Sequence, residues 1–397
     1  MFLEFFIWGA WFVTLGTFLG TNLKASGAET AAVFSTQSWG AIIAPFIIGL
    51  IADRYFNAER ILGVLHLVGA FLMYQMYQSS DLSSFYIYVF SYMVLYMPTL
   101  ALVNSVAFNQ MKDPEKEFSS IRVWGTIGWI VAGLSISYVF HWDSVESLAS
   151  GMLKNTFLLA GIAALVLGLL SFTLPATPPK VSDEKIKIGD IIGLDALKLL
   201  KDKNFAVFFI SSILICIPLA FYYQNANPFL TESGLENPTG KMAIGQISEA
   251  LFLLLIPVFF TKYGFKKTIL VGMLAWAIRY ALFAYGNGGE LSFMLIIGIA
   301  LHGICYDFFF VSGQIYTNSK AGDKYKSAAQ GLITLATYGV GMLIGFAVAG
   351  WITDNYKTAT GTINWEMVWI IPAGIALAVF VLFALTFNDK NKTEVSH

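Results

Sequence analysis

Apolar residues occupy most of this chain in long runs, and short polar segments separate the runs. A helix that spans the hydrocarbon core of a bilayer needs about 20 predominantly apolar residues. Twelve runs of this length predict twelve spanning helices, at approximately 2–22, 31–52, 61–79, 84–109, 121–141, 153–174, 204–229, 240–261, 266–286, 291–316, 326–351 and 364–387. The pattern therefore predicts an all-α membrane protein that crosses the bilayer many times.

The composition agrees with this interpretation. Hydrophobic residues make up 57% of the chain and charged residues 12%, whereas soluble domains carry about 25% charged residues. The formal net charge of −1 offers no basic surface, so no nucleic-acid partner is expected. Cys216 and Cys305 both lie inside apolar runs, where we expect them to pack without forming a disulfide or a metal site. No basic flank precedes the first run, so no cleavable signal peptide is expected.

The positive charges fall mainly on one side of the predicted helices. If both termini lie on the same side, that side collects 19 of the 24 Lys and Arg residues, and the opposite side carries four. Lys and Arg concentrate in cytoplasmic loops. We therefore expect both termini to be cytoplasmic.

One polar segment is longer than the others and divides the predicted helices into six and six. Residues 176–203 separate an N-terminal bundle over 1–175 from a C-terminal bundle over 204–397. The halves show a weak internal similarity, in which Ser119, Arg122, Thr126 and Gly133 align with Ser327, Gln330, Thr334 and Gly341. Chance matching of small residues between apolar helices is the alternative explanation. Two parallel six-helix halves resemble the layout of the major facilitator transporters, whose site lies between the halves near mid-membrane.

The loop after the second predicted helix resembles a signature of the major facilitators. It contains Gly49, Asp53 and Arg54 in the sequence GLIADRY, which matches the pattern G-x-x-x-D-R of their cytoplasmic 2–3 loop. Glycine permits close helix approach, and the aspartate can hold a neighbouring helix by its charge. We expect these residues to act in conformational gating; an ordinary charged helix end is the alternative.

A polar face is predicted on the helix over 121–141. Arg122, Thr126 and Trp129 are spaced by four and three residues, so they share one face of that helix. Burying an arginine in lipid costs at least about 2.5 kcal/mol, so a guanidinium in a spanning helix usually faces the bundle interior. We therefore expect this face to bind substrate.

The helix over 240–261 carries a candidate for proton coupling. Gln246 and Glu249 lie three residues apart on one face, and Glu249 lies about 13 Å deep if the helix begins at Gly240. A carboxylate near mid-bilayer requires a cation or a proton. We expect both residues to bind substrate and Glu249 to carry the proton. A permanent structural pair of Glu249 with an arginine is the alternative.

The helix over 291–316 contains His302, Tyr306 and Asp307. A histidine near a buried acid forms a plausible titrating pair. We expect His302 and Tyr306 to contact substrate and Asp307 to take part in proton coupling. The alternative for His302 is a hydrogen-bonded packing residue.

The helix over 204–229 ends in a dense cluster of phenols and amides. Tyr223 and Gln224 belong to this cluster, which immediately precedes Pro228. We expect them to contact substrate, because amides pair well with base edges and sugar hydroxyls. The alternative is that these groups satisfy a proline-broken helix.

Two charged residues receive structural interpretations. Glu4 lies close to the cytoplasmic end of the first predicted helix, where its carboxylate can extend to the interface. Arg279 lies well inside the helix over 266–286, and we expect it to be structural. No phosphate-binding loop, metal-ligand cluster or nucleophile motif occurs in the loops. We therefore expect no catalytic residue, cofactor, metal or enzyme activity.

Several stretches carry a resemblance beyond the superfamily. The segments WGAWFVTLGT, YMPTLALVNS, IRVWGTIGWI, GQISEALFLLLIPVFF, AWAIRYALFAYG and YDFF…SG resemble the nucleoside:proton symporter family, over nearly the whole chain. The resemblance implies uptake of purine and pyrimidine nucleosides with protons across the cytoplasmic (inner) membrane of a bacterium. It implies a substrate site formed by Arg122, Thr126, Trp129, Gln246, Glu249, His302 and Tyr306, with Asp307 joining Glu249 in proton coupling.

The chain also departs from the family pattern. Trp129 stands where the pattern has Phe, His302 where it has Tyr, and Ala220 and Tyr223 where it has Gln and Asn. These departures bear on base preference. We expect a monomer in the lipid bilayer. A sugar symporter or drug antiporter on the same scaffold is the main alternative, and a membrane receptor or enzyme without transport is the second.

Overall fold

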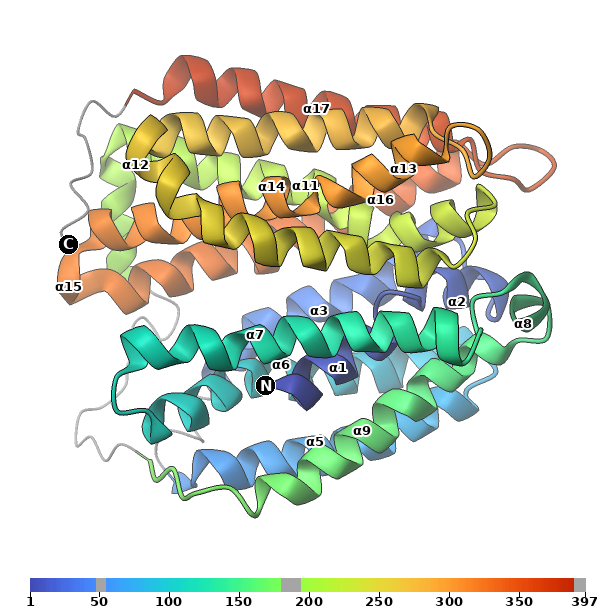
Figure 1. The fold of residues 1–397 in the computed structure, drawn as a ribbon, viewed down its shortest axis with the longest axis horizontal. Helices are drawn as coiled ribbons and strands as arrows, with labels where there is room; N and C mark the ends of the chain where they lie inside the picture. Colours follow the sequence, from blue (N-terminus) through green and yellow to red (C-terminus); the bar gives the residue numbers. More distant parts are fainter. Residues whose placement is uncertain (48–54, 180–193, 389–397) are drawn as a thin grey trace. The chain divides into compact units, whose positions relative to one another are not determined.

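The computed structural model describes residues 1–47, 55–179 and 194–388. Gly49, Asp53 and Arg54, which we expect in gating, lie outside the described residues. The chain forms two compact units: unit 1 is Met1–Lys187 with Glu236–Ala243, and unit 2 is Ile188–Leu235 with Ile244–His397. Figure 1 labels their helices along the chain.

Unit 1 consists of helices joined by short turns. Its elements are α1 (Phe2–Trp11), α2 (Leu15–Thr21), α3 (Gly27–Ile47), α5 (Ala58–Gln78), α6 (Leu82–Gln110), α7 (Pro114–Leu134), the π-helical η2 (Ser135–Val139), α8 (Val145–Ala149), the 3-10 turn η3 (Met152–Lys154) and α9 (Asn155–Ser171). Asp81 shows why α6 begins where it does, because its carboxylate accepts a hydrogen bond from the Ser84 amide at 2.9 Å.

Small residues allow the helices of unit 1 to pack closely. α1 packs against α7 and α9, while α5 packs against α6 and α9. A methyl group added at Gly128 of α7 would lie 2.2 Å from the carbonyl oxygen of Phe2, and one at Gly9 of α1 would lie 3.1 Å from Trp129. Glycine is therefore required where α1 crosses α7, and this contact determines where the polar face of α7 lies against α1.

Unit 2 is also helical, with several interruptions. Its elements are η4 (Leu194–Lys201), α11 (Lys203–Glu232), α12 (Pro238–Tyr285), α13 (Ser292–Ala300), α14 (His302–Tyr306), the π-helical η5 (Asp307–Val311), α15 (Ser312–Thr334), the π-helical η6 (Leu335–Gly341), α16 (Met342–Asn355) and α17 (Trp365–Thr386). The first residues of α12, up to Ala243, belong to unit 1. α11 packs against α16 and α17.

The interruptions in unit 2 have local causes. Gly264 divides α12 into two helices, because its φ of +76° is left-handed and favours glycine. Gly322 divides α15 in the same way, with a φ of +61°. The π-helical turn η5 begins at Asp307, and such turns often occur at functional positions in helices.

The helices agree with the predicted fold class. Nine helical stretches among the described residues are long and apolar enough to cross a bilayer, and one of them, Pro238–Tyr285, covers two predicted helices. In the same part of the chain, the only β pairing is an isolated bridge between Lys357 and Ile363. An all-helical membrane protein is therefore confirmed, while the number of twelve spans stays a prediction.

Candidate functional site

The polar face predicted on α7 is present in unit 1. Arg122, Thr126 and Trp129 are each half-buried, whereas Val123 and Trp124 beside them are exposed. The Arg122 guanidinium carbon lies 4.2 Å from the centre of the Phe5 ring of α1. A cation over an aromatic face is favourable, so Phe5 supports the guanidinium without neutralising its charge. Arg122 therefore remains able to bind an additional polar partner.

Trp129 extends the same face with an aromatic surface. Its ring meets the ring of Trp8 edge-on, with centroids 5.5 Å apart and an interplanar angle of 66°. Trp129 is half-buried, so part of this residue remains accessible.

A second polar cluster of unit 1 was not predicted. Glu4 is fully buried instead of reaching the interface, and its Oε2 lies 2.8 Å from Nε2 of His66 on α5. Thr99 donates a hydrogen bond to the other carboxylate oxygen, and the Tyr96 hydroxyl donates to the Glu4 carbonyl. The available signal was that Glu4 and His66 are lone ionisable residues in separate apolar runs, where such groups usually pair.

In unit 2, Glu249 of α12 and His302 of α14 lie next to each other. Oε2 of Glu249 is 3.7 Å from Nε2 of His302. The two side chains differ in access, since the Glu249 side chain is 27% exposed and the His302 side chain only 3%. A separation of 3.7 Å exceeds hydrogen-bond length, so the contact is electrostatic in this structure.

Two glycines bring these helices together. A methyl group at Gly303 would lie 2.5 Å from the Ser248 backbone, and one at Gly245 would lie 3.2 Å from Cβ of His302. The Ser248 hydroxyl also donates a hydrogen bond to the carbonyl of Ala300. The backbones of α12 and α14 therefore approach closely beside Glu249, and this approach places His302 against its carboxylate.

Arg279 contacts the opposite side of the His302 ring. One of its terminal nitrogens, Nη1, lies 2.9 Å from Nδ1 of His302. The arginine is fully buried, and its guanidinium carbon lies 3.7 Å from the centre of the Tyr222 ring. The sequence suggested a structural role for Arg279 without identifying its partner, because the register between the helices is not visible in the chain.

Further predicted residues gather around Glu249. The Tyr306 ring of α14 lies beside the His302 ring, with centroids 5.6 Å apart, and the Tyr223 ring of α11 lies 6.1 Å from that of Tyr222. The Tyr306 hydroxyl also contacts the hydroxyl of Tyr338 in η6, a residue that the sequence did not single out. Gln246 is half-buried and lies one helical turn before Glu249. Unit 2 therefore brings Tyr223, Gln246, Glu249, His302 and Tyr306 into one region.

The amides at the end of α11 behave differently from one another. Gln224 is 1% exposed, and neither atom of its amide has a hydrogen-bond partner. Asn225 donates a hydrogen bond to the Thr353 hydroxyl at 3.1 Å, so it joins α11 to α16. The unsatisfied Gln224 amide is the one of these two that still has hydrogen-bonding capacity for another group.

Asp307 is a buried acid five residues after His302. It is 1% exposed, and its Oδ2 has no hydrogen-bond partner. It also interacts electrostatically with Glu249. The interior of unit 2 therefore contains the carboxyl groups of Glu249 and Asp307 and the cation of Arg279. With both acids ionised this set has a net charge of −1, and one proton bound to either acid makes it neutral.

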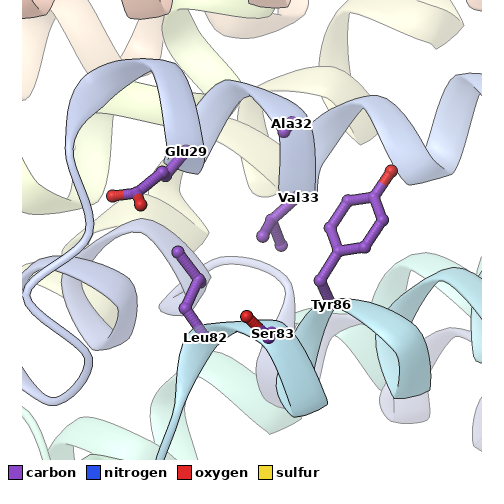
Figure 2. A pocket seen from close by; sticks show the side chains of 6 residues that line it. All are labelled: Glu29, Ala32, Val33, Leu82, Ser83 and Tyr86. Atoms are coloured by element: carbon purple, nitrogen blue, oxygen red, sulfur yellow. The ribbon is translucent and has the colours of Figure 1, made fainter.

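A pocket of about 380 Å³ lies between α3 and α6 of unit 1 (Figure 2). Its lining contains Glu29, Ala32, Val33, Leu82, Ser83 and Tyr86. None of the predicted site residues lines it, and Glu29 already accepts a hydrogen bond from the Ser26 amide. Among the described residues, no group of three or more His, Cys, Asp or Glu side chains gathers as metal ligands would.

Comparison with known proteins gives consistent matches over the full chain. A family model described as nucleoside H+ symporter matches residues 1–392. The putative nucleoside transporter YegT of Escherichia coli (strain K12) is 42% identical, with 98% of this chain and 93% of that protein covered. The nucleoside permease NupG of the same organism is 31% identical, with 98% and 94% covered.

Solved structures match as well. The crystal structure of the nucleoside transporter NupG superimposes with a TM-score of 0.86 at 30% identity, covering 98% of this chain and 97% of that one. The POT family transporter PepTSo has a TM-score of 0.73 at 16% identity, covering 97% and 95%. At 16% identity, the match to PepTSo shows a similar fold only.

Proposed function

The chain belongs to the nucleoside H+ symporter family, and on that premise we propose that it takes up nucleosides together with protons. It is a multi-pass integral membrane transporter with the fold of the major facilitators. The observation that most directly supports proton coupling is the Glu249 carboxylate, which lies in a membrane-spanning helix, is 27% exposed and approaches His302 to 3.7 Å. An ionisable group at such a position usually serves a proton or ion pathway.

Each unit offers its own groups to a nucleoside. In unit 1, Trp129 offers a stacking surface, while Arg122 and Thr126 offer hydrogen-bond donors on the same face of α7. Aromatic stacking is worth about 1–3 kcal/mol per base and tolerates different bases. This property suits a carrier of both purine and pyrimidine nucleosides.

Unit 2 offers the groups that suit hydroxyls and base edges. Gln246 supplies an amide with donors and acceptors, and Tyr223 and Tyr306 supply phenolic hydroxyls near Glu249. The unsatisfied amide of Gln224 is a further candidate. His302 is almost fully buried and bonded to Arg279, so its part in this site is to line the space behind Glu249.

The proton step follows from the cost of buried charge. A proton that binds to Glu249 or Asp307 from outside removes one negative charge from the interior of unit 2. The lower charge favours closure of the loaded carrier, and loss of the proton to the cytoplasm resets it. Because a nucleoside is uncharged near neutral pH, each cycle moves positive charge inward, so the membrane potential also drives uptake.

The orientation and setting of the carrier are part of the same proposal. The excess of Lys and Arg on one side favours both termini in the cytoplasm. The setting is the inner membrane of a bacterium, where a proton gradient acidic outside is available. The carrier is a monomer in this scheme, since each chain contains both six-helix halves.

The test is uptake into proteoliposomes that contain the purified chain. Labelled uridine, adenosine and glucose are supplied with and without an imposed gradient that is acidic outside. We expect uridine and adenosine to accumulate above the external concentration only with the gradient, and unlabelled nucleosides to compete. Accumulation of glucose, or inhibition by sugars or cationic drugs instead of nucleosides, would identify a different transporter. Nucleoside binding without flux would identify a receptor or enzyme.

A further inference from the structure

Arg279 is an unusual buried cation. Among the residues that the structure describes, no carboxylate forms an ion pair with its guanidinium. Its surroundings are aromatic, with the rings of Tyr222, Phe283 and Trp276 at 3.7, 5.6 and 5.9 Å from the guanidinium carbon. Two of its nitrogens, Nε and Nη2, have no hydrogen-bond partner. The bond from Nη1 to His302 is therefore a principal polar contact of this residue.

That bond determines where the imidazole carries its hydrogen. A guanidinium keeps its proton and can only donate hydrogen bonds. Nδ1 of His302 must therefore accept from Arg279, which leaves the single ring hydrogen on Nε2. Nε2 is the atom that lies 3.7 Å from Oε2 of Glu249. The order of donors and acceptors thus runs in one direction, from Arg279 through His302 to Glu249.

The same bond opposes protonation of the histidine. A second hydrogen on His302 would have to sit on Nδ1, which lies 2.9 Å from a guanidinium nitrogen that also carries hydrogens. Two donors and two positive charges would then face each other in a buried space. The Glu249 side chain is 27% exposed, so a proton can reach its carboxylate.

We propose that Arg279 is a positioning residue that keeps His302 neutral with its hydrogen directed at Glu249, so that the coupling proton resides on the carboxylate. The role of this proton in transport rests on the proposed function. The position of the hydrogen on His302 does not depend on it.

Other titratable groups surround this contact. Those that face His302 or Glu249 from the packed elements are Tyr222 and Tyr223 of α11, Arg279 and Tyr280 of α12, Cys305 and Tyr306 of α14, Asp307 of η5 and Tyr338 of η6. Among the described residues, Arg279 is the only permanent cation of this set, and Asp307 is its only other carboxyl group. The set therefore contains one residue, Arg279, whose charge opposes a proton on His302 at every pH.

The direct test observes the histidine itself. The chain contains four histidines, so protein labelled with ¹⁵N-histidine in lipid nanodiscs gives few imidazole signals, and the variant His302→Gln assigns one of them. We expect the His302 ring to stay neutral, with hydrogen on Nε2, from pH 8 down to pH 5. In Arg279→Gln we expect this fixed order to be lost, so that part of the signal comes from rings with the hydrogen on Nδ1.

The chain supplies a matched control for this experiment. His66 also contacts a buried glutamate, but it lies in unit 1 and has no bond to Arg279. Its ring signal should therefore be the same in the wild type and in Arg279→Gln. A wild-type His302 that gains a second ring proton between pH 8 and 5, or an Arg279→Gln signal that still shows the hydrogen on Nε2 alone, would overturn the proposal.

A transport measurement provides the second readout. Nucleoside exchange is measured in proteoliposomes with equal pH on both sides. Whatever their rates, we expect one pH transition in the wild type and in His302→Gln, because a glutamine can accept from Arg279 and donate to Glu249. We expect Arg279→Gln to shift the midpoint of this transition more in the wild-type background than in the His302→Phe background. An equal shift in both backgrounds would contradict the assignment to His302.

A second pair of variants covers the case in which Arg279→Gln does not reach the membrane. His302→Gln and His302→Phe then test whether a hydrogen bond from position 302 affects Glu249, because glutamine can accept and donate whereas phenylalanine can do neither. The pH midpoint of the single transition should then differ between His302→Phe and His302→Gln. Equal midpoints would refute the hydrogen directed from position 302 at Glu249.

The NMR measurement does not depend on transport. A wild-type protein that carries no nucleoside would therefore contradict the proposed function and leave the assignment of the His302 hydrogen intact.

Discussion

Within the part of the chain that the structure describes, each unit contains one contact between a buried histidine and a glutamate, and the two contacts differ in distance and in access. In unit 1, Glu4 is fully buried, its Oε2 lies 2.8 Å from His66, and its other oxygen accepts from Thr99. In unit 2, Glu249 is 27% exposed and lies 3.7 Å from His302, which is bonded on its far side to Arg279.

This difference shows which features distinguish a structural histidine–glutamate pair from one that can exchange a proton. Both oxygens of Glu4 have partners, so adding a proton breaks an existing bond in a place that solvent does not reach. Glu249 lies farther from its histidine than a hydrogen bond allows, and its side chain is partly exposed. Each pair joins a glutamate and a histidine from two helices, so the length of the contact and the exposure of the glutamate make the distinction.

The largest expected effect separates the two glutamates. Glu249→Gln removes the site that binds the coupling proton, so gradient-driven accumulation of uridine should fall to the level seen without a gradient. Exchange of nucleoside without a gradient should persist, because the amide keeps hydrogen-bonding capacity. Uptake into proteoliposomes measures both quantities.

Glu4→Gln is the matched control for that variant. Its accumulation ratio should stay at the wild-type value, since an amide can still bond to His66 and Thr99. Normal accumulation in Glu249→Gln, or its loss in Glu4→Gln, would reverse the roles that we assign to the two contacts.

The second effect tests whether binding and coupling use different residues. Arg122→Ala should weaken uridine binding about 10- to 100-fold, because a hydrogen bond to a charged donor is worth about 1.5–3 kcal/mol. The pH dependence of exchange should remain, since Glu249 is intact. Equilibrium binding of labelled uridine to the purified variant measures the affinity.

The exposed Arg60 of α5 provides the comparison for Arg122. Arg60→Ala removes the same charge from the same unit, and its uridine affinity should be unchanged. An unchanged affinity in Arg122→Ala, or an equal loss in both variants, would argue against a substrate contact at Arg122.

A smaller effect tests the geometry of the Glu249 contact. Gly303→Ala adds a methyl group that would lie 2.5 Å from the Ser248 backbone, so α14 must move away from α12. Overpacking of this kind costs about 1–3 kcal/mol. We expect a several-fold slower gradient-driven uptake, measured at equal amounts of reconstituted protein. Gly374→Ala in α17 is the control, because nothing lies within 4 Å of its added methyl group; equal rates in the two variants would show that the close approach is unimportant.

The smallest effect on transport belongs to the Glu4 contact, where the change should appear in stability. Glu4→Ala leaves His66 without its buried partner, which costs about 1–3 kcal/mol, while Thr99 keeps its hydrogen bond to the Tyr96 carbonyl. The melting temperature in detergent should fall, while Glu146→Ala, at an exposed acid of α8, should leave it unchanged. An unaltered melting temperature in Glu4→Ala would mean that this pair contributes no structural stability.

Several features of the molecule follow from the sequence by itself. The apolar runs determine the helices, because a bilayer leaves a polypeptide few other ways to satisfy its backbone. Spacing along one helix places Arg122, Thr126 and Trp129 on one face, since this relation is local. A carboxylate in the middle of an apolar run identifies Glu249 as a functional candidate, and the family motifs add the substrate class.

Only the tertiary structure decided how the ionisable residues pair. The sequence gives no register between α12 and α14, so the contacts that join Glu249, His302 and Arg279 were not predictable from it. The pair of Glu4 with His66 was missed for the same reason, because 62 residues separate them in the chain. Helix formation depends on neighbours along the chain, whereas pairing depends on how closely glycines such as Gly303 allow two helices to pack.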